Sequence, residues 1–299
     1  MKKSQGLSQG KRGPRTQEWA KAIEELRPEH DVAILLDCKQ MARSVFYYHR
    51  KRLNDEKYKH EKAEIASIYY LHKGRYGYRR VTAEMKNRGY SINHKTVQKL
   101  MRTLGLKCNV RKVSYRSYKG EVGKIAPNLL ERDFEASLPN QKWATDVTQV
   151  NIKDQKIYLS PIIDMFNGEV ISYSISKSPN MQMINEMLYE AFDKVKDTKG
   201  LIFHSDQGWQ YQHYGYRKAL EKNGIIQSMS RKGNCLDNAL AESFFGVLKT
   251  ELLYRQNFET ADEFIASLNE YIHYYNNKRI KNRLNGKSPV EYRALAQKT

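Results

Sequence analysis

The spacing of apolar residues changes at Pro139, and this change limits the folds that the chain can adopt. Before Pro139, apolar residues recur at intervals of three and four, which is typical of amphipathic helices. After it, residues 143–152 and 156–164 alternate between apolar and polar, which is typical of strands with one buried face. The dipeptide Asn167-Gly168 then favours a tight turn. We therefore predict a helical first part and a second part that begins with antiparallel strands.

The rest of the second part alternates between helices and strands. Further strands are predicted at 169–176, 200–204 and 225–229, and helices at 181–195, 213–222, 238–254 and 260–276. Three antiparallel strands followed by helix, strand, helix and strand define a mixed α/β fold, with a five-stranded sheet flanked by helices.

Charge is distributed unevenly between the two parts. The formal net charge is +19, and residues 1–125 hold 30 Lys and Arg against 12 Asp and Glu. Residues 126–299 are nearly neutral, with 22 against 21. This asymmetry indicates a nucleic-acid-binding module joined to a different activity, with an affinity that falls as salt rises.

Other classes of protein are disfavoured by composition. No apolar run approaches the ~18 residues that span a bilayer, and no signal peptide follows the basic start, so we expect the chain in the cytoplasm. The three cysteines, Cys38, Cys108 and Cys235, are too scattered to indicate a disulfide framework or a zinc site.

Residues 59–118 have the pattern of a compact DNA-binding domain. A helix is predicted around Ile65 and a second from Tyr78, while Asn93 is suited to cap a third that Gly105 ends. The polar face of the third helix consists of His94, Lys95, Gln98, Lys99 and Arg102. Three short helices with a basic last helix resemble a helix-turn-helix, whose final helix enters the major groove. Any small basic three-helix domain would show the same pattern.

The remaining segments of the first part are less informative. Residues 1–15 are rich in Lys, Gly, Ser and Gln and are expected to be disordered, or ordered only on DNA. A short helix is expected at 17–26, apolar stretches lie at 32–36 and 41–53, and residues 111–119 resemble a basic arm. The predicted organisation is a basic helical region at 1–58, a helix-turn-helix domain at 59–118, a linker at 119–137 and an α/β domain at 138–299.

Three acidic residues are candidates for a metal-dependent site. Asp146 lies in a strand-like run, and Asp206 follows an apolar strand beside a glycine turn, where ligand sites commonly form. Glu242 lies on an apolar helix seven residues before Lys249, so the two share one helix face. Such carboxylates can gather divalent cations beside a phosphodiester. Each residue also has a simpler explanation, as a surface carboxylate, a turn cap or part of a charged helix face.

The loop before that helix is basic. Arg231 and Lys232 are candidates for contacts with the DNA backbone, although the loop is equally consistent with a solvated turn. Asp237 or Asn238 is expected to cap the helix that follows.

Several sequence blocks resemble one family of DNA-processing enzymes. The blocks are residues 143–148 (WATDVT), 204–211 (HSDQGWQY), 228–251, 76–80 (YGYRR), 92–95 (INHK), 274–276 (YYN) and 288–292 (SPVEY). Together they resemble the DDE transposase and retroviral-integrase superfamily, which has a ribonuclease-H-like fold. The resemblance is strongest to the downstream-frame transposase of the insertion sequence three family, in its IS-one-fifty-like branch.

The resemblance implies an activity and a set of site residues. The catalytic and metal-binding triad would be Asp146, Asp206 and Glu242, and Lys249 would contact DNA. Two Mg²⁺ ions, for which Mn²⁺ would substitute, would support cleavage at the terminal inverted repeats of the element and transfer of the strands to other DNA. The resemblance also implies a homo-oligomer on DNA and an upstream-frame partner protein. Residues expected to support the fold or the site are His204, Trp209, Asp164 and Asn238.

Three other classes stay open at this point. A tyrosine recombinase would need an Arg/His cluster around a nucleophilic tyrosine, and His213 and Arg217 lack a companion set. A ribonuclease H would share the fold but leave the basic first part without a purpose. A non-catalytic DNA-binding regulator would retain a degenerate ribonuclease-H-like core.

Overall fold

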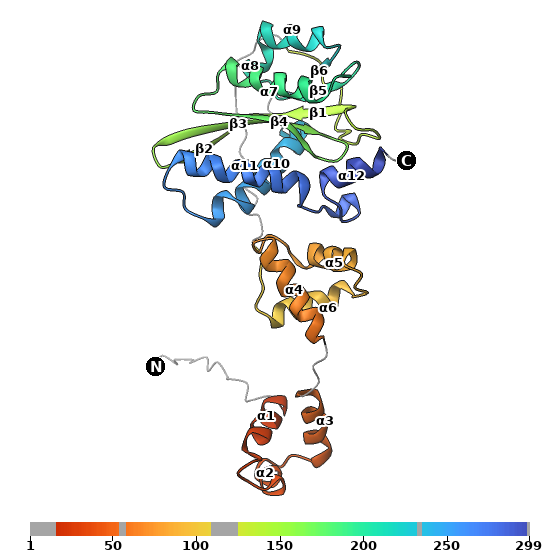
Figure 1. Cartoon of the computed structure of the whole chain (residues 1–299), viewed down its shortest axis with the longest axis vertical. Helices are drawn as coiled ribbons and strands as arrows, with labels where there is room; N and C mark the ends of the chain where they lie inside the picture. Colours follow the sequence, from red (N-terminus) through yellow and green to blue (C-terminus); the bar gives the residue numbers. More distant parts are fainter. Residues whose placement is uncertain (1–15, 54–57, 109–124, 232–234, 298–299) are drawn as a thin grey trace, which may run out of the picture. The chain divides into compact units, whose positions relative to one another are not determined.

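The computed structural model describes residues 16–53, 58–108, 125–231 and 235–297 (Figure 1). The chain forms two compact units, residues 1–63 and 64–299. The segment expected to be disordered, 1–15, and the predicted basic arm, 111–119, lie outside the described residues.

The first unit contains a cluster of three helices. They are α1 (Thr16–Leu26), α2 (Val32–Lys39) and α3 (Arg43–Leu53). Their buried side chains are Ala20, Ile23, Leu36 and Phe46. The helix predicted at 17–26 is confirmed as α1, and the two apolar stretches that followed it in the prediction are the helices α2 and α3.

The three helices predicted for the DNA-binding region are confirmed. They are α4 (Lys59–Leu71), α5 (Tyr78–Asn87) and α6 (His94–Thr103). Asn93 caps α6 by accepting a hydrogen bond from the Lys95 amide at 2.8 Å, which satisfies a donor of the first helical turn. Gly105 follows α6 with a φ of +69°, a left-handed conformation that favours glycine.

The second unit also contains a mixed sheet of six strands (Figure 1). The strands are β1 (Lys142–Thr145), β2 (Thr148–Ile152), β3 (Gln155–Asp164), β4 (Val170–Ser176), β5 (Ile202–Ser205) and β6 (Ile226–Met229). Strands β2, β3 and β4 form antiparallel pairs, whereas β5 runs parallel to both β1 and β6. The predicted mixed α/β class is therefore confirmed.

The predicted number of five strands was wrong, because residues 143–152 form two strands. β1 and β2 both pair antiparallel with the same edge of β3, and Asp146 and Val147 lie between them. The Val147 amide donates to Asp146 Oδ1 at 2.7 Å. A short polar side chain that bonds to a neighbouring amide competes with the strand ladder, and here the ladder is interrupted at Asp146.

Helices cover both faces of the sheet (Figure 1). One face is covered by α7 (Met181–Lys194), α8 (Trp209–Gln212) and α9 (Tyr214–Lys222), and the other by α10 (Ala239–Glu251) and α11 (Ala261–Asn277). The helix predicted at 213–222 is α9, and His213 caps it by accepting from the Gly215 amide at 3.1 Å. No described helix is both long enough and apolar enough to cross a membrane.

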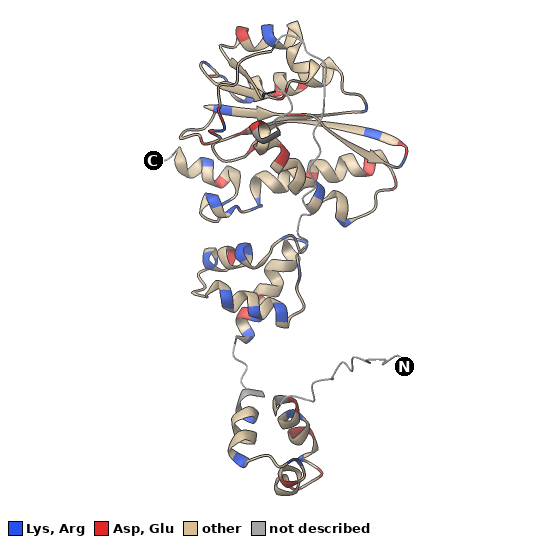
Figure 2. Cartoon of the chain, turned by 180° about the vertical axis from the view of Figure 1, so that it is seen from behind, with Lys and Arg blue, Asp and Glu red and all other residues tan. Residues whose placement is uncertain are grey.

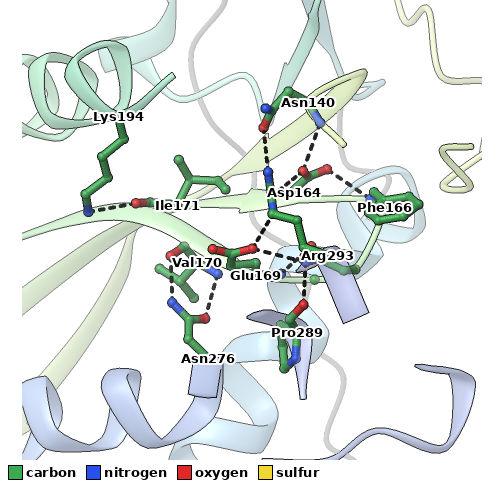
Figure 3. Close-up of polar contacts among 12 residues, drawn as sticks. Asn140, Asp164, Phe166, Glu169, Val170, Ile171, Lys194, Asn276, Pro289 and Arg293 are labelled. Atoms are coloured by element: carbon green, nitrogen blue, oxygen red, sulfur yellow. Dashed lines mark hydrogen bonds and ion pairs between the residues drawn. The ribbon is translucent and has the colours of Figure 1, made fainter. Parts of the chain in front are cut away.

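The C-terminal helix α12 (Pro289–Ala296) is fixed to the turn between β3 and β4 (Figure 3). Arg293 donates to Asp164 Oδ2 and to Glu169 Oε2, both at 2.6 Å. Asp164 is buried and also accepts from the amides of Asn140 and Phe166. Asp164 thus holds the end of the chain against the sheet, in line with the supporting role expected for it.

Candidate active site

Two of the three predicted acidic residues lie at the ends of adjacent parallel strands. β1 and β5 pair with Ala144 opposite His204. Asp146 and Asp206 each lie two residues beyond that pair, at the carboxyl ends of the strands. Because neighbouring strands are about 4.8 Å apart, this pairing brings the two aspartates to one edge of the sheet, where ligands commonly bind in α/β folds.

The turn after β5 fixes the carboxylate of Asp206. Its Oδ1 accepts a hydrogen bond from the Gly208 amide at 2.8 Å. A Cβ added to Gly208 would lie 2.9 Å from that same oxygen and 3.0 Å from Gln210 Oε1. A side chain at position 208 would therefore displace the Asp206 carboxylate, which explains a glycine at this turn.

Helix α10 brings Glu242 toward the same edge. Asn238, directly before α10, donates from Nδ2 to the carbonyl of Thr145 at 3.1 Å, and Thr145 precedes Asp146. Glu242 lies about one helical turn after Asn238, on the same side of the helix, and its side chain is exposed. Asn238 occupies the predicted N-cap position of α10, but its side chain makes no cap hydrogen bond and joins the helix to β1 instead.

The pKa of Asp146 is affected by the other charged residues of the site. Its removal from water raises the pKa of Asp146 well above the ordinary value, and the carboxylates of Asp206 and Glu242 raise it further. The Val147 amide and the Lys249 ammonium act in the opposite direction. Burial also raises the pKa of Asp206. The site therefore has an unbalanced negative charge that a cation would compensate.

A buried tyrosine lies within electrostatic range of the two aspartates. The hydroxyl of Tyr211 is 3.4 Å from Thr145 Oγ1, and the side chain is 1% exposed. Burial, together with Asp146 and Asp206, raises the pKa of Tyr211 well above its ordinary value, so the phenol stays neutral. Sequence reasoning gave Tyr211 no role, although it lies in the 204–211 block, five residues after Asp206.

The other expected supporting residues differ in their positions. His204 is buried and its Nδ1 lies 2.9 Å from Ser228 Oγ, which links β5 to β6. Burial lowers the pKa of His204 to about 4, so the ring is neutral at physiological pH. Trp209, the first residue of α8, is 55% exposed, and its expected supporting role stays a prediction.

The basic loop before α10 is organised by a buried carboxylate. Asp237 accepts from Arg231 Nε and Nη2 at 2.9 and 3.0 Å, and from Arg132 Nε at 3.3 Å. Arg231 holds the pKa of Asp237 well below its usual range. Asp237, the other predicted helix cap, is therefore engaged with Arg231. Lys232 lies outside the described residues, and a DNA contact by Arg231 stays a prediction.

The residues predicted to contact DNA on α6 lie on its outer face. Buried side chains of α6 are Val97, Leu100 and Met101. The five predicted residues, His94, Lys95, Gln98, Lys99 and Arg102, are all exposed. Basic residues recur along α4, α5 and α6 (Figure 2). This separation of faces leaves a basic, amide-bearing helix surface available to a polyanion.

The carboxylates of the described residues are not grouped as a set of metal ligands. Across residues 16–53, 58–108, 125–231 and 235–297, no three His, Cys, Asp or Glu side chains are grouped so that they could hold a metal ion. Asp206 and Glu242 nevertheless both lie within electrostatic range of Asp146. The two strand-borne aspartates are fixed by local hydrogen bonds, and the side chain of Glu242 is exposed.

Comparisons with known proteins assign both regions to known families. Residues 136–235 and 242–296 match the integrase core domain family, and residues 56–113 match the HTH-like domain family. The chain is 51% identical over 274 residues to the putative transposase InsK for insertion sequence element IS150 of Escherichia coli K12, covering 91% of this chain and 97% of that protein. It is 34% identical over 277 residues to the transposase InsF for insertion sequence IS3A of the same organism, covering 90% and 96%. The solved HTLV-2 integrase catalytic core domain in complex with magnesium matches 52% of this chain and 98% of its own, at 22% identity and a TM-score of 0.42.

An HTH-like domain followed by an integrase core defines a transposase of the integrase superfamily. The chain belongs to the IS3 family of insertion-sequence transposases. The predicted family and its function as a DNA transposase are thereby confirmed, in preference to the recombinase and ribonuclease H alternatives.

Proposed function

We propose that Asp146, Asp206 and Glu242 are the catalytic and metal-binding residues of this transposase, and that it cleaves and joins DNA strands with two Mg²⁺ ions. The main support is the parallel pairing of β1 with β5, since each of these strands ends at an aspartate. The hydrogen bond from Asn238 to Thr145 supports the inclusion of Glu242, because it ties the start of α10 to the end of β1.

The donor set suits divalent cations. Carboxylate oxygens are the ligands that Mg²⁺ prefers, and positive charge would relieve the repulsion that raises the pKa of Asp146. Two bound cations would activate the attacking oxygen and stabilise the leaving 3′ oxygen of the phosphodiester. Mn²⁺ is expected to substitute for Mg²⁺, since both accept oxygen ligands.

The residues of the chain would hold and orient the reacting groups. Asp146 and Asp206 would supply ligands from two strand ends, and Glu242 would supply one from the facing helix. Lys249, on the same helix face, would bind a DNA phosphate. Water would be the first nucleophile and the freed 3′-OH of the element the second, so no side chain would bond covalently to DNA.

The proposal includes the partners of the reaction. The outer face of α6 would bind the terminal inverted repeats of the element, with its N-terminal residues directed at base edges. Two element ends must be held together for joining, so we expect a homo-oligomer on DNA. An upstream-frame protein is the expected further partner.

A supercoiled donor plasmid that carries the candidate element ends would test the proposed function. We expect wild-type protein to cut at the element termini with Mg²⁺ and to join the freed 3′ ends to other DNA, but not in the presence of a chelator. Sequencing of the joined strands identifies the cut positions. A covalent protein–DNA adduct would point instead to a tyrosine nucleophile, and binding without any metal-dependent cleavage would point to a regulator.

Neutralising a basic residue of α6 is expected to weaken binding to the element ends. For Lys99→Gln and Arg102→Gln, we predict about a tenfold loss of affinity and a decrease of about one in the slope of log K against log salt. Fluorescence anisotropy with a labelled end duplex across a salt series measures both quantities. Lys222→Gln, an equally exposed change on α9, is the control, and an equal loss there would show only a general charge effect.

A further inference from the structure

The helix-turn-helix region contacts the catalytic region at a buried carboxylate, Glu251. This residue ends α10 and is 5% exposed. Its carboxylate accepts two hydrogen bonds from Arg279, both at 2.8 Å, and one from the Tyr271 hydroxyl at 3.1 Å. The remaining bond comes from Arg80 Nη1, at 3.1 Å, and Arg80 belongs to α5 of the helix-turn-helix region.

A second arginine of the same region caps the end of α10. Arg75 donates from Nε to the backbone carbonyl of Glu251 at 3.1 Å. Its guanidinium also lies over the rings of Tyr274 and Tyr271, 4.6 and 5.1 Å from their centroids. Carbonyl groups at the end of a helix carry partial negative charge, so a cation there stabilises the helix end. Arg80 in turn donates to the carbonyl of Arg75 at 3.3 Å, which joins the two arginines.

Buried aromatic side chains complete the contact. Tyr76 is fully buried, and its hydroxyl donates to the carbonyl of Lys278 at 3.1 Å and accepts from the Ile280 amide at 2.9 Å. His72 stacks on Tyr76 with ring centroids 3.8 Å apart, and its Nδ1 lies 3.1 Å from the Tyr274 hydroxyl. The 76–80 block, expected as part of the DNA-binding module, thus directs two of its side chains into the catalytic region.

We propose that Arg75 and Arg80 are positioning residues that couple the helix-turn-helix region to the catalytic helix α10, an inference that rests on the proposed function of Glu242. Glu242 and Glu251 lie on one helix of 13 residues, which is about 20 Å long and moves largely as a rigid rod. Asn238 fixes its start to β1, and Arg75 and Arg80 fix its end to the DNA-binding region. Displacement of the helix-turn-helix region by bound DNA would therefore be transmitted to the orientation of Glu242.

Arg80→Gln tests this coupling in the full-length chain. We expect its affinity for a labelled element end, measured in Ca²⁺ to prevent cleavage, to stay within about twofold of wild type. We expect its cleavage rate at saturating DNA in Mg²⁺ to fall about tenfold, because small displacements of reacting groups cost rate without costing binding. Arg80→Lys keeps the positive charge and is expected to recover part of that rate.

The matched control is Arg88→Gln. Arg88 is similar to Arg80 in side-chain exposure, 29% against 25%, but its ion pairs are with Glu64 and Glu84 inside the helix-turn-helix region. We expect this variant to cleave at the wild-type rate. Equal cleavage by Arg80→Gln and wild type, or equal losses in Arg80→Gln and Arg88→Gln, would overturn the coupling.

Hydrogen exchange separates a failure of this inference from a failure of the proposed function. In wild type, we expect end DNA to change the protection of the α10 amides, and in Arg80→Gln we expect that change to be lost. This measurement needs no catalysis. If wild type cleaves DNA and both proteins show the same change in α10 protection, the coupling is rejected and the proposed function stands. If wild type does not cleave DNA, the proposed function is rejected, and the exchange result alone decides the coupling.

Discussion

Replacement of Asp146 by Asn is expected to lower the rate of metal-dependent strand cleavage by about 10³-fold or more, equivalent to at least about 4 kcal/mol of transition-state stabilisation. The change keeps the shape of the side chain and an acceptor for the Val147 amide, but it removes the charge proposed to bind a cation. The measurement is single-turnover cleavage of a labelled element end, with Mg²⁺ varied. Binding of that end through α6 is expected to be unaffected.

The same variant has a second expected property that does not depend on activity. Because Asp146 repels Asp206 and Glu242, its neutralisation should leave the melting temperature without metal unchanged or slightly higher. Added Mg²⁺ or Mn²⁺ should stabilise wild type by mass action and stabilise Asp146→Asn much less.

Asp154→Asn provides the matched control for both measurements, since Asp154 is exposed in the turn between β2 and β3. We expect it to retain wild-type cleavage and wild-type metal stabilisation. Retention of cleavage by Asp146→Asn would remove Asp146 from the catalytic assignment.

The sequence predicted the parts of this site that depend on local pattern. Asp206 follows a run of apolar residues and precedes a glycine turn, which predicted a strand that ends before it. Glu242 and Lys249 lie seven residues apart in an apolar run, which predicted a helix with both residues on one face. The interruption of the strand at Asp146 was not, because Val147 and Thr148 continue the alternation of the run that precedes them. There a single side-chain hydrogen bond to the Val147 amide outweighs strand propensity.

Contacts between distant segments left no local signal in the sequence. The bond from Asn238 to Thr145 joins residues 93 apart, and the bond from Arg80 to Glu251 joins residues 171 apart. In neither bond does the sequence pattern around one residue indicate its distant partner. Arg80 in particular, within a basic block, was interpreted as part of a DNA-binding module, because a single sequence does not distinguish an arginine that faces phosphate from one that faces a buried carboxylate.

Loss of Arg293 is expected to destabilise the α/β region strongly. Arg293→Met leaves Asp164 buried with its two backbone amide donors but without its cation, and removes the ion pair to Glu169 (Figure 3). Removing one partner of a buried pair typically costs about 3–5 kcal/mol, because the remaining charge stays uncompensated. We therefore expect the melting temperature, followed by circular dichroism, to fall by about 10 °C. Lys196→Met removes an exposed ion pair to Asp193 and is expected to cost less than about 1 kcal/mol.

The pH dependence of the stability lost in Arg293→Met tests whether Asp164 is the cause of that loss. Burial already raises the pKa of Asp164 in wild type, and Arg293 opposes that rise. Without Arg293 the folded-state pKa moves further above the unfolded value, so the folded protein binds the extra proton and stability increases as pH falls. Arg293→Met should therefore be closer to wild type at pH 5 than at pH 8, and Asp164→Asn added to it should restore stability at pH 8. The loss of stability in Arg293→Met could instead be the same at both pH values and persist in the double variant. That result would mean that α12 detaches because the packing of the Arg293 side chain is lost, and not because the Asp164 carboxylate is uncompensated.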